Sequence, residues 1–360
     1  MTENQYIQET LASLQAHLAR HPQALAEDTV KFLFQALLGV GHLLGSRETV
    51  EQFIAREMQD QHPSLVEPLA ETISPCWFRL NLRRAMAEGL TVQNIAALML
   101  TSHATTQFTR EDVLHVIRNT ADICSMAISK KELDRITEPG WLPSHSENYR
   151  RAYHPAYRLI SADWLPLMPA ICKIAQESVQ SGHLLVTLDG PCASGKTTLA
   201  EKLAKVFDAA VIHTDDFVVP HAKKTPERLA IPGGNCDWER LVQEVIAPWK
   251  AGDHPQYRKF DCRSDCLLLP EPLGSDHIMI LEGSYCNLPA IHNFADVRLF
   301  MVTSASLRAE RLKRRESPES LRRYHEKWIP LEDAYFSAFS LPDSDCIRIE
   351  QDESSTCDEN

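Results

Sequence analysis

The sequence of 360 residues lacks an excess of basic residues. It contains 37 Lys and Arg residues against 49 Asp and Glu residues, which gives a formal net charge of −12. Because the phosphates of nucleic acids attract basic protein surfaces, this acidity argues against general nucleic-acid binding. Any anion that the protein binds must therefore be held by a local group of hydrogen-bond donors.

The sequence also lacks an apolar run of the ~20 residues that a membrane-spanning helix requires. Its first residues do not form a charged segment followed by an apolar one, as a secretory leader would. The ten cysteines are scattered, and the closest pair, Cys262 and Cys266, has no second pair to complete a structural zinc site. We therefore expect a cytoplasmic protein that does not bind membranes, and the length predicts about two domains.

Strand-like alternation of apolar and polar residues is rare in the first 140 residues. Apolar residues recur instead at three- and four-residue spacing, as at Leu33, Leu37 and Leu38, which indicates amphipathic helices. Thr109, followed by acidic residues, is a plausible helix N-cap. The sequence predicts an all-α domain of unknown role over residues 1–140, with helices at 3–20, 24–44, 76–90, 91–108 and 109–127.

Helical periodicity is lost after residue 138, where two prolines and a glycine fall among polar residues. We expect a connector and a helix over 141–181, and we consider whether His145, Tyr149 and Arg150 of the connector reach a functional site. Short apolar runs then alternate with helical stretches, which predicts a parallel sheet covered by helices over 182–350. A flexible acidic tail is expected at 351–360. The four apolar runs lie at 184–188, 209–213, 277–281 and 297–302.

A phosphate-binding loop follows the first of these runs. Residues 190–197 match the pattern G-x-x-x-x-G-K-[ST] between a predicted strand and a predicted helix. Glycines let the backbone turn sharply and bring its N–H groups to the phosphates, which the start of the helix also attracts. By chance the pattern would occur about once in a hundred chains of this length. We predict that ATP binds to Gly190, Pro191, Cys192, Ala193, Ser194, Gly195, Lys196, Thr197 and Thr198.

The ends of two further strands supply carboxylates. The second apolar run is followed by Asp215 and Asp216, and the third by Glu282. Ligands bind at the carboxyl ends of the strands in open α/β sheets. A single aspartate there is more often a helix cap, but two acids at two strand ends beside a phosphate loop favour a catalytic role. We predict that Asp215 is the general base and that Thr197, Asp215 and Glu282 bind Mg²⁺.

Arginines are concentrated in the helical run at 306–315. Arg308, Arg311 and Arg315 fall on one face of that helix. A solvated helix face is one interpretation, and a lid is the other, because guanidinium groups on a mobile segment would neutralise charge on a transferred phosphoryl group. We predict a lid in which Arg311 and Arg315 act with Lys196 and Asp215 as the catalytic residues.

Residues 183–349 resemble the phosphoribulokinase/uridine kinase family of P-loop kinases. The motifs Asp-Gly-Pro-Cys-Ala-Ser-Gly-Lys-Thr-Thr, Thr-Asp-Asp-Phe, Gly-Gly-Asn-Cys-Asp-Trp, Ile-Leu-Glu-Gly-Ser-Tyr and Trp-Ile-Pro-Leu-Glu occur in the family order. The bacterial uridine kinase-like members look closest. The resemblance implies a five-stranded parallel sheet with an arginine-bearing lid, and the use of ATP and Mg²⁺.

The resemblance also implies roles for individual residues. Asp215 matches the catalytic aspartate of the family, Glu282 its strand-end acid, and Asp237 the position that holds sugar hydroxyls in nucleoside kinases. Residues 260–265 depart from the Tyr-Asp-Phe and following His that nucleoside kinases show at the base pocket, so the acceptor need not be a nucleoside. The predicted acceptor-binding residues are Asp216, Asp237, Tyr285 and Arg314.

These features predict an ATP-dependent kinase that phosphorylates a hydroxyl of a small nucleoside-like or sugar-like metabolite. The alternative is a nucleotide-dependent switch or scaffold, in which the helical first half binds a protein partner. Acids positioned at 215 and 282 favour the enzyme, because a binding module has no need of a general base. The identity of the acceptor, the choice between ATP and GTP, and the oligomeric state stay open.

Overall fold

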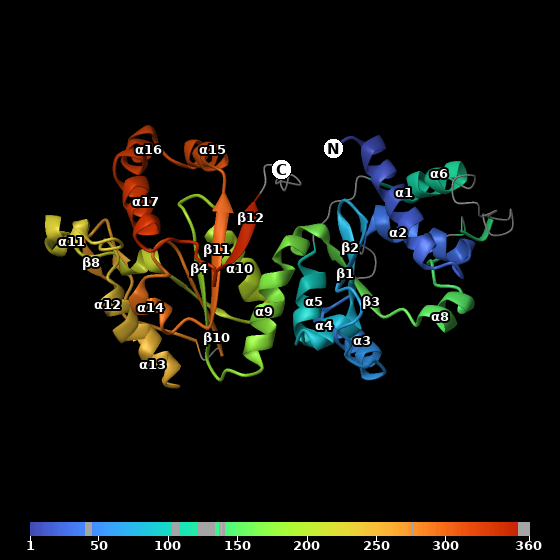
Figure 1. Ribbon diagram of the computed structural model, residues 1–360, viewed down its shortest axis with the longest axis horizontal. Coiled ribbons are helices and arrows are strands. Elements are labelled where there is room, and N and C mark those ends of the chain that lie inside the picture. The colour runs from blue at the N-terminus through green and yellow to red at the C-terminus, as the bar shows by residue number, and fades with distance from the viewer. Residues whose placement is uncertain are drawn as a thin grey trace. The chain divides into compact units, whose positions relative to one another are not determined.

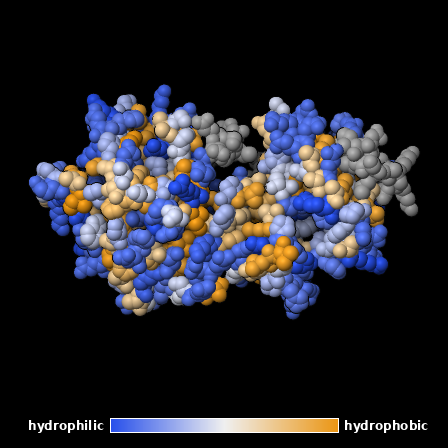
Figure 2. Space-filling view, viewed as in Figure 1, coloured by the Kyte–Doolittle hydropathy of each residue, from blue (hydrophilic) through white to orange (hydrophobic). Residues whose placement is uncertain are grey.

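The computed structural model describes residues 1–39, 45–102, 108–120, 134–136, 138, 141–274 and 277–351. The chain divides into two compact units, Met1–Leu165 and Pro166–Asn360. Residues 352–360 of the predicted acidic tail, and parts of the predicted helices 24–44, 91–108 and 109–127, lie outside the described residues. Hydrophilic residues predominate on the face shown in Figure 2. No helix in the described part of the chain is long and apolar enough to cross a membrane.

Three helices open the first unit; the first two lie within predicted ranges, and the third, at Arg47–Gln59, lies where no individual helix was predicted. They are α1 (Glu3–Arg20), α2 (Ala26–Leu38) and α3 (Arg47–Gln59). The hydroxyl of Thr2 accepts a hydrogen bond from the N–H of Gln5, which satisfies a backbone donor at the start of α1. Most side chains of α2 are buried in the core of this unit, since apolar residues occupy more than one of its faces.

The prediction of an all-α first unit is wrong beyond α3. An antiparallel sheet has the strand order β1 (Ala70–Ser74), β2 (Trp77–Asn81) and β3 (Tyr157–Ser161). Residues 76–90, predicted as one helix, form β2 and then α4 (Leu82–Ala87). The first four residues of β2 are all buried, so the strand lacks the alternation by which a sequence distinguishes strand from helix.

The segment predicted as a connector contributes to both units. Its residues supply β3, the third strand of the first unit's sheet, and the helix predicted near 162–181 is a 3₁₀ helix at Ala162–Leu167 followed by α9 (Met168–Ser178). The N-cap predicted at Thr109 is confirmed, because its side-chain oxygen accepts from the N–H of Asp112. The described residues of the first unit also form α5 (Val92–Leu100), α6 (Arg110–Thr120) and α8 (Glu147–Tyr153).

The predicted α/β P-loop fold of the second unit is confirmed (Figure 1). Five strands, all parallel, stand in the order β12-β11-β4-β10-β5. Every residue of the central strand β4 is buried, as expected for a parallel strand with helices on both faces. The strands are β4 (Leu184–Asp189), β5 (Ala210–His213), β10 (Ile278–Glu282), β11 (Val297–Thr303) and β12 (Ile347–Gln351).

A hydrophobic core on this sheet joins the strands to the C-terminal helices. Met279 and Leu281 of β10 pack there with Trp249 and with Tyr335 from α17, all almost completely buried. The other elements are α10 (Lys196–Phe207), α11 (Pro226–Ala230), α12 (Trp238–Leu241), α13 (Ala247–Lys250), α14 (Pro289–His292), α15 (Ala305–Arg315), α16 (Pro318–Arg323) and α17 (Ile329–Ala338), with the short strands β6 (Gln256–Tyr257), β7 (Phe260–Asp261), β8 (Cys266–Leu267) and β9 (Glu271–Pro272).

Candidate active site

The predicted phosphate loop connects the end of β4 to the start of α10. Gly190 and Gly195 have φ angles of +140° and +93°, in the region that favours glycine. A Cβ atom on Gly190 would lie 2.7 Å from the carbonyl oxygen of Met301 in the neighbouring strand, which leaves no room for a side chain. The loop can therefore adopt this path only with glycine at its first position.

The carboxylate of Asp189 stabilises the first turn of the phosphate loop. It is completely buried and accepts hydrogen bonds from the N–H of Gly190 at 2.7 Å, the N–H of Asn287 at 3.0 Å and the hydroxyl of Tyr335 at 2.7 Å. Burial raises the pKa of Asp189 to about 6, although these donors act in the opposite direction. The sequence offered Asp189 as part of a motif but gave no sign of its bond to Tyr335, 146 residues away.

Lys196 and Thr197 lie at the start of α10, where the sequence places them. The Lys196 ammonium donates to the carbonyl oxygens of Gly190 at 2.8 Å and Pro191 at 3.0 Å, so it lies along the loop. The Thr197 hydroxyl donates to Oε1 of Glu282 at 3.0 Å. The structure thus brings together two of the three predicted Mg²⁺ ligands.

A histidine that the sequence did not single out joins this pair. His213, at the end of β5, is the register partner of Glu282 in β10, and its Nδ1 contacts the same carboxylate oxygen. The hydrogen bond to Glu282 raises the pKa of His213. A hydroxyl and a carboxylate are ligands that suit Mg²⁺, which usually also takes water and phosphate oxygens. No group of three or more His, Cys, Asp or Glu side chains in the described residues could hold a metal ion alone.

Asp215 and Asp216 follow β5 in the 3₁₀ helix Thr214–Phe217. Desolvation raises the pKa of Asp215, repulsion from Glu282 raises it further, and Lys196 lowers it. Asp215 is nevertheless exposed to solvent, so an incoming molecule can reach its carboxylate. Oδ2 of Asp216 is buried and has no hydrogen-bond partner in the described residues. Asp215 therefore lies within electrostatic reach of both the phosphate loop and the predicted metal ligand.

The arginines of α15 do not all point to the loop. Arg311 donates to the carbonyl of Ala193 at 3.2 Å and to the side chain of Gln351 at 2.8 Å. Arg315 instead bonds to Glu316 at 2.8 Å and to the hydroxyl of Tyr324 at 3.2 Å. Arg314 is exposed, and its nearest acid is Glu310 at 3.9 Å. Of the two predicted lid arginines, Arg311 contacts the loop and Arg315 does not in the described part of the chain.

Two of the predicted acceptor-binding residues already have structural partners. Asp237 is the N-cap of α12 and accepts from the N–H of Arg240 at 3.3 Å. Tyr285 is buried, and its ring packs edge-on against Tyr335 with centroids 5.1 Å apart. These contacts give each residue a role in the fold that is independent of any acceptor.

Glu332 is a loop contact to which the sequence assigned no role. Its buried carboxylate accepts from the N–H of Cys192 at 2.9 Å and from the hydroxyl of Ser284. Glu332 thus ties α17 to the phosphate loop and to the segment after β10. The Trp-Ile-Pro-Leu-Glu motif marked Glu332 in the sequence, but the motif could not indicate which residues Glu332 contacts.

We expect Glu332→Gln to destabilise the protein. The amide oxygen can still accept from the N–H of Cys192, but the hydroxyl of Ser284 then faces an N–H donor and loses its carboxylate acceptor, and losing a buried hydrogen bond to a charged group costs about 1–3 kcal/mol. Chemical denaturation would measure the change in the free energy of unfolding. Glu310→Gln, on the exposed face of α15, is the matched control. Equal stability of the two variants would show that the Glu332 contacts contribute nothing.

Comparisons with known proteins find likeness at the level of solved structures. No protein-family model and no curated protein matches the chain. A "possible uridine kinase" from Bacillus stearothermophilus is 20% identical over 47% of this chain and 93% of its own, with a TM-score of 0.34. A candidate fructose transport system kinase from Silicibacter sp. TM1040 is 23% identical over 47% of this chain and 93% of its own, with a TM-score of 0.40. At these values the likeness carries no argument about activity.

Proposed function

We propose that the second unit is an ATP-dependent kinase that phosphorylates a hydroxyl group of a small nucleoside-like or sugar-like metabolite. One observation carries this proposal. Thr197, at the end of the phosphate loop, is hydrogen-bonded to Glu282, and the exposed carboxylate of Asp215 interacts with both Glu282 and Lys196. In this proposal the nucleotide-binding loop, the metal ligands and the base share one edge of the sheet.

The loop and its lysine account for nucleotide binding in this proposal. Backbone N–H groups between Gly190 and Thr198 would hold the phosphates of ATP. The Lys196 ammonium would give up its hydrogen bonds to the loop carbonyls and donate to the terminal phosphates instead. Thr197 and Glu282, with Asp215, would hold Mg²⁺, which neutralises phosphate charge when bound. Arg311 starts next to the loop and would move from Ala193 to the transferred group.

The acids account for the acceptor side. Asp215 would take the proton of the acceptor hydroxyl while the oxygen of that hydroxyl bonds to the terminal phosphorus and ADP departs. The unpartnered Oδ2 of Asp216 would accept a hydrogen bond from the acceptor. Asp237, Tyr285, Arg314 and Arg315 complete the proposed acceptor and lid residues, although for Arg314 and Arg315 this requires movement of α15 from its present contacts.

The test is an ADP-release assay on the full chain with pooled nucleosides, sugars and vitamins as acceptors. Release of ADP that depends on an acceptor, and that is lost in Asp215→Asn, supports the kinase. A broad panel that gives no stimulation, while ATP still binds, would instead favour the nucleotide-dependent switch or scaffold. Substitution of GTP for ATP in the same assay would identify the phosphoryl donor.

A further inference from the structure

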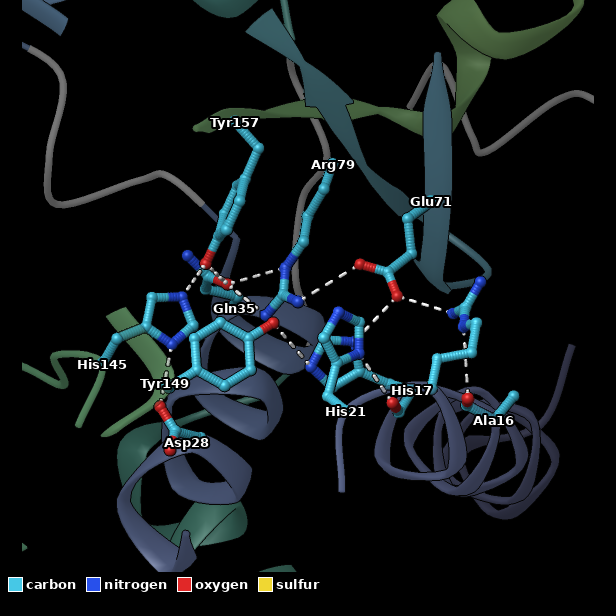
Figure 3. A network of polar contacts seen from close by, with 11 residues as sticks. Ala16, His17, His21, Asp28, Gln35, Glu71, Arg79, His145, Tyr149 and Tyr157 are labelled. Atoms are coloured by element: carbon cyan, nitrogen blue, oxygen red, sulfur yellow. Dashed lines mark hydrogen bonds and ion pairs between the residues drawn. The ribbon is translucent and has the colours of Figure 1, made fainter. Parts of the chain in front are cut away.

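The first unit contains a buried polar network that the proposed kinase reaction does not use (Figure 3). Asp28 of α2 accepts from Nδ1 of His145 at 2.9 Å and from the N–H of Ser146 at 3.0 Å. Nε2 of His145 lies 2.7 Å from the hydroxyl of Tyr157, which is also 3.2 Å from Oε1 of Gln35. His145, which the sequence analysis considered as a connector residue that reaches a functional site, is therefore engaged within the first unit.

A buried arginine adjoins this chain of hydrogen bonds. Arg79 of β2 is 2% exposed and lies between Gln35 and Glu71, to which it donates at 2.8 Å and 3.3 Å. Its guanidinium is 4.6 Å from the ring centroid of Tyr157. The Nε–H of Arg79 also donates to Gln35, at 3.2 Å, so three of the five guanidinium N–H groups bond to Gln35 or Glu71. The other two N–H groups have no acceptor in the described residues.

Lys31 brings a second positive charge to the same place. It follows Asp28 by three residues and precedes Gln35 by four, so the three side chains lie on one face of α2. The Lys31 ammonium is half-buried, 5.9 Å from the ring centroid of Tyr157, and forms no hydrogen bond or ion pair with any described residue. Desolvation, together with repulsion from Arg79 and Arg150, lowers the pKa of Lys31 to about 8, although the carboxylates of Asp28 and Glu57 act in the opposite direction.

A purely structural role explains only part of this arrangement. Asp28 accepts one hydrogen bond from the N–H of Leu25 at the start of α2, and three from His145 and Ser146 that hold α2 against the segment before α8. Lys31 and the exposed Arg150 make no such contact with any described residue, and the carboxylates of Asp28 and Glu71 offset only part of the repulsion among Lys31, Arg79 and Arg150. Such a local excess of positive charge is also notable in a chain whose net charge is −12.

We propose that Lys31, Arg79 and Arg150 form a binding site for a small oxyanion, the carboxylate or phosphate group of a small molecule. The charges attract the anion, and the unused donors of Arg79 and Lys31 supply hydrogen bonds to its oxygens. Gln35 accepts hydrogen bonds from Arg79 of β2 and Tyr157 of β3, and Asp28 holds His145 before α8, so the site is preorganised. The half-buried Lys31 and the exposed Arg150 form the side that solvent reaches.

The test measures amide hydrogen exchange in α2 and α8 of the full chain, with inorganic phosphate or with malonate at constant ionic strength. Either anion should slow exchange there in the wild type, and the more effective one identifies the group that the site prefers. A Lys196→Ala background separates this effect from phosphate bound at the loop, because the first-unit protection should persist in that background. Wild-type protein that shows no slowing with either anion would overturn the proposal.

Two variants distinguish a binding site from a structural charge. Lys31→Met should raise the unfolding temperature without anion, because it removes repulsion, and should weaken anion binding at least tenfold; the same change at Lys173, an exposed lysine of α9, should do neither. Arg150→Ala, at an exposed position that should not disturb folding, should also weaken binding about tenfold. Anion protection that is unchanged in both Lys31→Met and Arg150→Ala would contradict the site.

Discussion

We expect Asp215→Asn to lower kcat of the proposed kinase by a factor of about 10² or more while ATP affinity changes little. The amide cannot accept the proton of the acceptor hydroxyl, and it removes one of the charges that orient the acceptor. Asp215 makes no hydrogen bond to the phosphate loop in this structure, so its loss leaves the nucleotide contacts of Lys196 and the loop amides in place. Steady-state kinetics and equilibrium ATP binding, measured on the same preparation, check both parts.

The pH dependence of turnover gives this prediction a second readout. A general base must be ionised, so turnover falls as the pH drops through the pKa of Asp215. Because desolvation and Glu282 raise that pKa, the acidic limb should lie above the ordinary value of 3.8. Asp253→Asn, which changes an exposed aspartate after α13, is the control. Turnover that is equal in Asp215→Asn and wild type would remove Asp215 from the mechanism.

Lys196→Ala is expected to weaken ATP binding by about 10- to 100-fold, the loss that follows from removing charge-assisted hydrogen bonds to phosphate. Lys196 is buried against the loop, and its ammonium already lies within 3.0 Å of two loop carbonyls. Isothermal titration calorimetry with ATP would measure the change in dissociation constant.

The matched control for this variant is Lys202→Ala. Lys202 is an exposed lysine of the same helix α10, so its removal tests for nonspecific loss of positive charge. We expect its ATP affinity to equal that of the wild type. If Lys196→Ala also binds ATP as tightly as the wild type, the loop does not hold the nucleotide as proposed.

The α/β half of the fold could be read from local sequence because its signals are local. The strand, glycine-rich loop and helix at 184–207 are consecutive in the chain, and the conformation of Gly190 and Gly195 is a property of those residues. The carboxylates at Asp215 and Glu282 could be placed because parallel strands end at the same edge of a sheet. The contact between Thr197 and Glu282 agrees with that reasoning.

The sheet of the first unit could not be read in this way. Its strands β2 and β3 are separated by about half of that unit and pair only in the folded state. In addition, Trp77, Phe78, Arg79 and Leu80 are all buried, so no polar alternation marks β2. The sequence did not indicate that Arg79 is buried. Its burial is possible because the fold brings Gln35 and Glu71 close enough to accept its hydrogen bonds.

The sequence by itself determined the phosphate loop, the parallel strand pattern and the acids at two strand ends, because each depends on neighbours along the chain. Only the tertiary structure decided which long-range partners complete the site. It placed Glu332 on Cys192 and Tyr335 on Asp189, kept Arg311 rather than Arg315 at the loop, and gathered Lys31 with Arg79 in the first unit. These contacts join residues that are far apart in the chain, and the packing of whole elements determines which of them meet.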